Sequence, residues 1–355
     1  MPRTFSHRPV EEWISEFERA IRRDPARRGL IGSEEVFGPV CPGELAQAAM
    51  HLEAHARSVA IVTGFYIPAG DPPAAETDGP PGALVLAQAL QHMGVETQII
   101  TDGFCFSAVR AAASGSGYPP ERVVRYPHPV ANGGADSAES TRWLDDFWRS
   151  DRGRGLTHLI AIERVGPSHT PESLAAQQRP GPPPVESFLQ KVPECHRNAC
   201  HNMRGMIIDE YSGDLHRLFE EAVRKNPAIK TIGIGDGANE IGMGVAAWED
   251  LERRLTGDHA GWIPCRIATD WNIVAGTSNW GGYALAAAVA LLRGDLAAIA
   301  PFDAAHQLRV LEAMIANGPA VDGVTRRREA TVDGLLFLTY IQAWEAIRTK
   351  LKLPE

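Results

Sequence analysis

The feature that most constrains the fold is an alternation of short apolar segments with longer helical ones between residues 58 and 292. The apolar segments are rich in Val and Ile and are bounded by Gly, Pro or Asp, which is typical of buried strands. Strands that alternate with helices form a parallel sheet covered on both faces. The sequence therefore predicts an α/β protein with a doubly wound, mainly parallel sheet of about six or seven strands, and extra helices at both termini.

The expected strands are 58–67, 95–101, 122–126, 158–165, a segment that begins at 231, and 266–274. The expected helices are 9–28, 42–57, 82–93, 104–113, 138–149, 213–225, 245–255, 279–292, 303–316 and 334–349. We expect one compact unit made of a helical addition (1–57), an α/β core (58–300) and C-terminal helices packed on the core (301–355). Within the core, the Pro-rich segment 166–200 is predicted to be a mobile loop or a lid over the strand ends.

Composition and charge exclude several classes of protein. The net charge of −9 argues against nucleic acid or an anionic membrane as a partner. No apolar run reaches the roughly 18 residues that a membrane span needs. Glu11 and Glu12 argue against a transit peptide, and five scattered cysteines fit a reducing compartment. We expect a cytoplasmic protein that acts on a small molecule, and the sequence leaves a homo-oligomer open.

The stretch Thr231–Gly244, TIGIGDGANEIGMG, has the form of a strand, a glycine turn and a following helix. Its GIGDGA matches the dinucleotide-binding pattern G-x-G-x-x-A. However, Asp236 lies within the turn and Glu240 is expected to open the following helix, so two carboxylates would repel a pyrophosphate. No Lys-Ser or Lys-Thr follows, which excludes a P-loop. We therefore expect no nucleotide cofactor, and the alternative interpretation is a plain turn with an acidic helix cap.

Polar residues also follow the other predicted strands. Ligands of such folds bind beyond the carboxyl ends of the strands, so these residues are candidates for one site. They are Glu76, Asp78 and Gly79 after the first strand, Asp102 after the second, Glu163 at the end of the fourth, Asn239 in the glycine turn, and Asn279 where a helix begins. Taken singly, each of them could be structural; Asp78, for example, could be a helix cap.

A dense group of cysteines and histidines, CHRNACH at 195–201, suggests zinc because Cys195, His196, Cys200 and His201 all carry zinc-binding atoms. The spacing matches no standard zinc finger, and adjacent Cys-His pairs are awkward for tetrahedral coordination. We favour a surface loop.

Six motifs, in this order, resemble the D-glutamate cyclase family: ETDGPPGA (76–83), AIERVGP (161–167), HNMRG (201–205), GIGDGANEIGMG (233–244), AGTSNWGGYALA (275–286) and VDGL (332–335). The resemblance covers roughly residues 30 to 350. Vertebrate members of the family carry the domain in a longer mitochondrial enzyme, and this sequence is expected to lack their additional N-terminal domain. The resemblance implies a reversible hydro-lyase that closes D-glutamate to 5-oxo-D-proline and water. The cysteine-rich run before NMRG departs from the family pattern.

The residues suit that reaction, which needs a base for the amine, polarisation of the γ-carboxyl group and a hold on the α-carboxylate. Arg204 offers a bidentate clamp for a carboxylate, with a plain surface arginine as the alternative. The predicted catalytic residues are Asp236, Glu240 and Glu163. The predicted substrate-binding residues are Glu76, Asp78, Gly79, Asp102, Asn202, Arg204, Asn239 and Asn279. Asp236, Glu240 and Asp78 are candidate ligands for Mn²⁺ or Mg²⁺, because carboxylate oxygens suit these ions.

Two other functions remain open at this point. The same acids could serve a metal-dependent hydrolase or phosphatase of a small anionic metabolite, with water as the nucleophile. The fold could also carry a sensor that binds a small molecule without turning it over.

Overall fold

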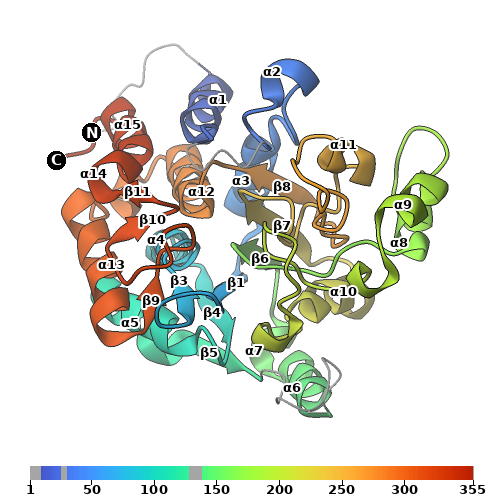
Figure 1. Cartoon of the computed structure of the whole chain (residues 1–355). Helices are drawn as coiled ribbons and strands as arrows, with labels where there is room; N and C mark the ends of the chain where they lie inside the picture. Colours follow the sequence, from blue (N-terminus) through green and yellow to red (C-terminus); the bar gives the residue numbers. More distant parts are fainter. Residues whose placement is uncertain (1–8, 25–29, 128–137, 355) are drawn as a thin grey trace.

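A six-stranded sheet forms the centre of the computed structural model, which describes residues 9–24, 30–127 and 138–354 (Figure 1). Its strands are β1 (Ser58–Thr63), β4 (Glu96–Asp102), β5 (Val123–Tyr126), β6 (His158–Ile162), β7 (Lys230–Gly235) and β8 (Trp271–Val274). The spatial order is β5-β4-β1-β6-β7-β8, and every pairing is parallel. The predicted α/β fold with a parallel sheet is confirmed.

Alternate residues of the central strands enter two separate apolar clusters, one on each face of the sheet. Val59 and Ile61 of β1 belong to the first cluster, whereas Ala60 and Val62 belong to the second. This follows from the two-residue period of a strand, which sends successive side chains to opposite faces. Helices cover both faces, so the strands are apolar on both sides, as a buried parallel sheet requires.

The helices are α1 (Val10–Ile21), α2 (Glu34–Phe37), α3 (Glu44–His55), α4 (Pro80–His92), α5 (Phe106–Ser116), α6 (Ala138–Arg149), α7 (Asp151–Arg154), α8 (Pro171–Ala176), α9 (Val185–Lys191), α10 (His216–Lys225), α11 (Trp248–Glu252), α12 (Ser278–Arg293), α13 (Ala304–Asn317), α14 (Phe337–Tyr340) and α15 (Gln342–Lys350). Short 3₁₀ turns lie at Pro120–Arg122, Glu194–His196, Asp209–Tyr211 and Leu296–Ala298. Side chains of α1, α3, α4, α5, α12, α13 and α15 enter the first cluster, and those of α6, α10 and α11 enter the second. None of the described helices is long and apolar enough to cross a membrane.

Two small sheets accompany the central one. β2 (Tyr66–Ile67) pairs antiparallel with β3 (Ala74–Glu76), which in turn pairs in parallel with β9 (Ala320–Val321). β10 (Thr331–Val332) and β11 (Leu335–Leu336) form a hairpin. The C-terminal part of the chain therefore contributes strands as well as helices, and the predicted helix 334–349 is wrong in its first turn.

Three predicted strands are too long. The segment 58–67 is interrupted after Thr63, because Gly64 turns with a φ of 107° and a Cβ there would lie 2.7 Å from Thr101 Oγ1. The segment 158–165 leaves the sheet at Glu163, which has a φ of 48°. In the segment 266–274, only Trp271–Val274 belongs to the central sheet. The earlier residue Ala268 forms isolated bridges with Gly242 and Met243.

The Pro-rich segment 166–200 was predicted to be a mobile loop or a lid, and the structure shows that part of it is helical. It contains α8 and α9, and Leu174, Phe188 and Val192 pack with Trp248 of α11 in a small apolar cluster. Thr170 begins α8 with a capping box, in which its side chain accepts a hydrogen bond from Ser173 N. In Figure 1, α8 and α9 lie far from the β10–β11 hairpin, on the opposite side of the molecule.

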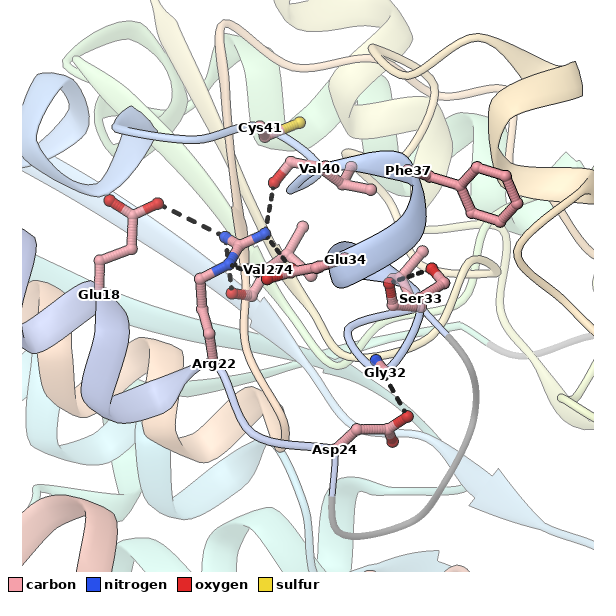
Figure 2. Close-up of polar contacts among 12 residues, drawn as sticks. Glu18, Arg22, Asp24, Gly32, Ser33, Glu34, Phe37, Val40, Cys41 and Val274 are labelled. Carbon is pink, nitrogen blue, oxygen red and sulfur yellow. Dashed lines mark hydrogen bonds and ion pairs between the residues drawn. The ribbon is translucent and has the colours of Figure 1, made fainter.

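The N-terminal helices are attached to the core through Arg22, which lies just beyond α1 (Figure 2). Its guanidinium donates hydrogen bonds to Val40 O at 2.7 Å and to Glu34 Oε1 at 2.6 Å, and it reaches Val274 O at the end of β8 at 3.5 Å. The predicted helix 9–28 ends at Ile21, and its positions 25–28 lie outside the described residues.

Candidate active site

The strand order identifies where a ligand should bind. β1 and β6 are neighbours at the centre of the sheet, and the chain adds β4 and β5 on one side of them and β7 and β8 on the other. Such a switch point leaves a crevice beyond the carboxyl ends of the two strands. A pocket of about 650 Å³ lies there, and its walls include Phe65 after β1 and Glu163 after β6.

The pocket walls come from segments far apart in the sequence. They are 65–69, Glu76, Glu163, 202–206, Asn239 and Glu240, 255–263, and 323–326. None of these described wall residues belongs to 166–200, so the predicted lid does not cover this pocket. The turn just after it, 202–206, contributes one wall instead.

Six acidic residues, called the carboxylate cluster below, gather at this end of the sheet: Glu76, Asp78, Glu163, Asp236, Glu240 and Asp333. Each is at most 4% exposed. Carboxylate oxygens of Asp78, Asp236 and Asp333 lie within 4.8 Å of one another, and so do those of Glu163, Asp236 and Glu240. Asp236 belongs to both groups.

Burial and mutual repulsion shift the acidities of this cluster. Burial raises the pKa of Glu76 well above its usual value, and the nearby charges of Glu163, Asp333 and Asp78 raise it further. The side chain of Glu163 thus has the largest effect on the pKa of Glu76 after burial itself. The pKa of Asp78 is likewise raised well above its usual value, first by burial and then by Asp333 and Glu163.

Asp78 and Asn279 position the two helices that begin at the cluster. The Asp78 carboxylate accepts hydrogen bonds from Ser278 N at 2.7 Å and Asn279 N at 2.9 Å, at the start of α12. In return, Asn279 Oδ1 accepts from Gly79 N at 3.0 Å and Gly82 N at 2.8 Å, at the start of α4. Asp78 therefore caps a helix, as the alternative interpretation predicted. The helix it caps is α12, however, and not α4, which follows Asp78 in the sequence.

Glu163 is held over the pocket by an uncommon backbone conformation. Its φ of 48° lies in the left-handed region, which residues other than glycine adopt rarely. Ser278 Oγ donates a hydrogen bond of 2.5 Å to Glu163 Oε2. Gly79 makes room for this arrangement, because a Cβ at that position would lie 2.7 Å from Glu163 Cβ.

Asp236 follows the last residue of β7, as predicted, but Glu240 does not begin a helix. Residues 236–247 form an irregular segment, and α11 begins only at Trp248. Close packing explains the difference, since Gly242 lies against Gly233 with a φ of 114° and leaves no room for side chains. Glu240 is instead placed by an antiparallel bridge to Val165, and its Oε1 accepts a hydrogen bond of 2.9 Å from Gly237 N.

The sequence interpretation missed Asp333, although VDGL was among its motifs. Asp333 and Gly334 form the two-residue turn between β10 and β11, with φ values of 53° and 76°. Asp322 fixes this turn, because its Oδ2 accepts a hydrogen bond of 2.8 Å from Gly334 N. Asp-Gly between two short apolar runs is a strong hairpin signal, and it could have revealed that the acid stands at a turn rather than within a helix.

Three other predicted site residues have different surroundings. Asp102 is fully buried, forms an ion pair of 2.6 Å with Arg164, and accepts a hydrogen bond from Gly213 N. Asn202 lines the pocket and shapes its turn, since its Oδ1 accepts from Arg204 N and Met206 N. Arg204 itself lines the pocket and is exposed. Arg326 lines it as well, and sequence reasoning did not select it.

The Cys/His group at 195–201 does not assemble a zinc site. His196 Nδ1 and His201 Nε2 lie 3.0 Å apart, but Cys195 is exposed and Cys200 packs in an apolar cluster with Phe65 and Val165. The groups of described residues that could hold a metal contain neither cysteine nor histidine. The pKa of His201 falls to about 4, mainly because the ring is buried.

The donor atoms around Asp236 suit a hard divalent cation. They are carboxylate oxygens, and the neighbouring Asn239 adds a side-chain carbonyl. Asn239 is 2% exposed, its Nδ2 donates to His201 O at 2.9 Å, and within the described parts of the chain its Oδ1 accepts no hydrogen bond. A buried carbonyl oxygen without a donor is costly unless it meets a ligand. Oxygen donors of this kind are those that Mg²⁺ and Mn²⁺ prefer.

Comparison with known proteins agrees with these features. The sequence model of the family described as "D-glutamate cyclase-like, C-terminal" matches residues 17–179 and 188–348. The chain is 32% identical over 282 residues to the human protein named "D-glutamate cyclase, mitochondrial". That match covers 79% of this chain and 39% of the human protein. The chain therefore belongs to the D-glutamate cyclase-like family, in the part that the family description calls C-terminal.

Proposed function

We propose that this protein is a hydro-lyase that interconverts D-glutamate with 5-oxo-D-proline and water. The observation that carries the proposal is the carboxylate cluster at the switch point of the sheet, in a chain of the D-glutamate cyclase-like family. The substrate is inferred from the name of the human relative, and the pocket contains chemical groups that suit that substrate.

The reaction sets definite demands on the pocket. In the forward direction, the α-amine nitrogen attacks the γ-carboxyl carbon, a C–N bond forms and one C–O bond breaks. Two protons move from the ammonium nitrogen to the departing oxygen, which leaves as water. The active site must therefore hold two carboxylates of the substrate, polarise one of them, and carry protons between two substrate atoms.

The cluster can meet the demand for polarisation and proton transfer. Glu163, Asp236 and Glu240 would hold a divalent cation, and such a cation polarises a carboxyl group and stabilises the charge on a departing oxygen. Glu76 lines the pocket, and burial together with the nearby charge of Glu163 raises its pKa well above the usual value. We assign to Glu76 the transfer of a proton to the departing oxygen.

The pocket also offers cations for the α-carboxylate. Arg204 and Arg326 stand on two different wall segments, 202–206 and 323–326, and both side chains reach the pocket. Arginine binds carboxylates in a bidentate manner, which fixes orientation as well as position. A substrate whose α-carboxylate binds one of these arginines would present both its amine and its γ-carboxyl group to the carboxylate cluster.

The direct test is to incubate the purified protein with D-glutamate, L-glutamate and each enantiomer of 5-oxoproline, with and without Mn²⁺. Chiral chromatography then follows the products. We expect interconversion of the D-enantiomers, dependent on the cation. Absence of turnover with tight binding of D-glutamate would favour a sensor, and release of phosphate from small phosphate esters would favour a hydrolase.

A further inference from the structure

Cyclisation of D-glutamate requires a base that removes a proton from the α-ammonium group of the substrate. The amine cannot attack while it is protonated, because its electron pair is then held in an N–H bond. The carboxylate cluster serves the other end of the substrate, where Glu76 would protonate the departing oxygen of the γ-carboxyl group. The base must therefore stand beside the α-carbon, next to the group that binds the α-carboxylate.

His259 is the only histidine among the described residues of the pocket wall. It belongs to the wall segment 255–263, and its side chain is half-buried. Within the described parts of the chain, neither nitrogen of its ring has a hydrogen-bond partner, so both can meet a ligand. Histidine exchanges protons near neutral pH and is the side chain that most often acts as a general base.

Two glycines make room for the side chain of His259. A Cβ on Gly205 would lie 2.7 Å from His259 Cβ and 2.9 Å from its Cγ, and a Cβ on Gly257 would lie 2.8 Å from its Cε1. Both glycines have a positive φ, of 73° and 88°, which other residues rarely adopt. The Trp262 ring lies edge-on to the imidazole, with 6.3 Å between the ring centroids. These contacts restrict the ring to one part of the pocket wall, as a base that acts at a fixed point requires.

The contact with Gly205 indicates which end of the substrate His259 serves. Gly205 directly follows Arg204 in the turn 202–206, so His259 packs against the residue next to the proposed clamp for the α-carboxylate. The α-amine and the α-carboxylate are attached to the same carbon atom. A substrate bound through Arg204 would therefore place its ammonium group on the His259 side of the pocket.

We propose that His259 is the general base of the cyclisation, an inference that rests on the proposed function. An N–H bond of the α-ammonium group breaks, the proton binds a ring nitrogen of His259, and the freed electron pair forms the C–N bond to the γ-carbon. The imidazolium then releases its proton to solvent. Glu76 protonates the departing oxygen, and its carboxylate takes the second proton from the nitrogen. The C–O bond breaks, and solvent supplies the second proton of the water that leaves.

The test combines kinetics with chemical rescue, with D-glutamate as the substrate. We expect kcat of His259→Ala and His259→Gln to fall by a factor of about 100 to 10,000, the usual contribution of a general base, with KM changed by less than about threefold. Added imidazole should raise kcat of His259→Ala by about tenfold or more, because it can occupy the space of the missing ring. It should not restore Asp236→Asn, whose defect lies elsewhere. The exposed His92→Gln is the matched control and should keep full turnover.

Circular dichroism checks the folding of each variant, and the more conservative His259→Gln serves if His259→Ala does not fold. A folded His259 variant with kcat within about threefold of the unaltered protein would overturn the inference. A loss that lies mainly in KM, or one in His259→Ala that imidazole does not reduce, would overturn it as well. Each of these results leaves the proposed function standing. Absence of D-glutamate turnover in the unaltered protein would instead overturn the proposed function, and the inference with it.

Discussion

Arg204 lines the pocket from an exposed turn, whereas Arg164 is not among the wall residues and is buried and paired with Asp102. From the sequence, both arginines and Asp102 stand beside strand ends and look equally functional. Burial separates them, because a buried arginine needs a partner and takes the nearest acid. Residue type and spacing predicted which side chains gather at this end of the sheet, but not which of them face the substrate.

A charge-removing change at Arg204 tests its role. We expect Arg204→Gln to raise KM for D-glutamate by about tenfold to a hundredfold, with a much smaller effect on kcat, because a charge-assisted hydrogen bond contributes about 1.5–3 kcal/mol to binding. Steady-state kinetics on both variants measures this, with the exposed Arg224→Gln as the matched control. An unchanged KM in Arg204→Gln would show that the α-carboxylate is held elsewhere.

The helices α4 and α12 are matched elements. Both helices begin at the carboxylate cluster. Asn279 of α12 caps the start of α4, and Asp78, just before α4, caps the start of α12. The two helices also pack closely, because a Cβ on Gly82 would lie 2.8 Å from the Cα of Asn279. The sequence predicted both helices within one to two residues, because their apolar periodicity is local. Their reciprocal capping could not be predicted, since it joins residues about 200 positions apart.

Asn279→Ala tests that capping. Two buried backbone N–H groups of α4 would lose their acceptor, and each buried donor without a partner costs about 1–3 kcal/mol. We expect the free energy of unfolding to fall by about 2 kcal/mol or more in urea titrations with an unchanged m-value. Asn317→Ala, at an exposed helix end, serves as the control. A loss below about 0.5 kcal/mol would mean that the cap is dispensable.

Strand β6 carries the catalytic candidate Glu163 after its last residue and a buried histidine at its first. Burial, and then the neighbouring His51 and His55, lower the pKa of His158 to about 3. In the unfolded chain the pKa of a histidine is near 6.5. Between these values the unfolded state binds a proton that the folded state does not, so the free energy of unfolding falls as pH decreases through this range.

We therefore expect His158→Gln to be less sensitive to acid than the unaltered protein. Between pH 7 and pH 5, the free energy of unfolding of the unaltered protein should fall by about 2 kcal/mol more than that of the variant, at about 1.4 kcal/mol for each pKa unit. Urea titrations at several pH values measure both. Parallel pH profiles would contradict the assignment of a neutral, buried His158.

At the scale of the whole molecule, the sheet has the strand order of dinucleotide-binding folds and the site lies at the same switch point. The site differs in charge, since six buried acids stand where such folds hold a pyrophosphate. The alternation of strands and helices was sufficient to predict the architecture. It failed for 166–200, where short helices packed by Phe188 and Trp248 have too few residues to show a period.

Long-range packing also explains the other failures. Glu240 was expected to open the following helix. Instead, Gly242 packs against Gly233 of β7, and an antiparallel bridge to Val165 places Glu240. The acids still meet, because the predicted strands lie side by side in one parallel sheet, although β1 and β6 end earlier than predicted. The central claim is that this meeting of acids is an active site for D-glutamate cyclisation.

The most direct measurement compares Asp236→Asn with the unaltered protein, for both D-glutamate turnover and melting temperature on the same preparations. Asparagine keeps the size of the side chain and removes the charge that both ligand groups share. The account predicts turnover lower by a factor of about 100 or more with a melting temperature close to that of the unaltered protein, since relief of repulsion offsets the lost contacts. A folded Asp236→Asn protein with full turnover would contradict it.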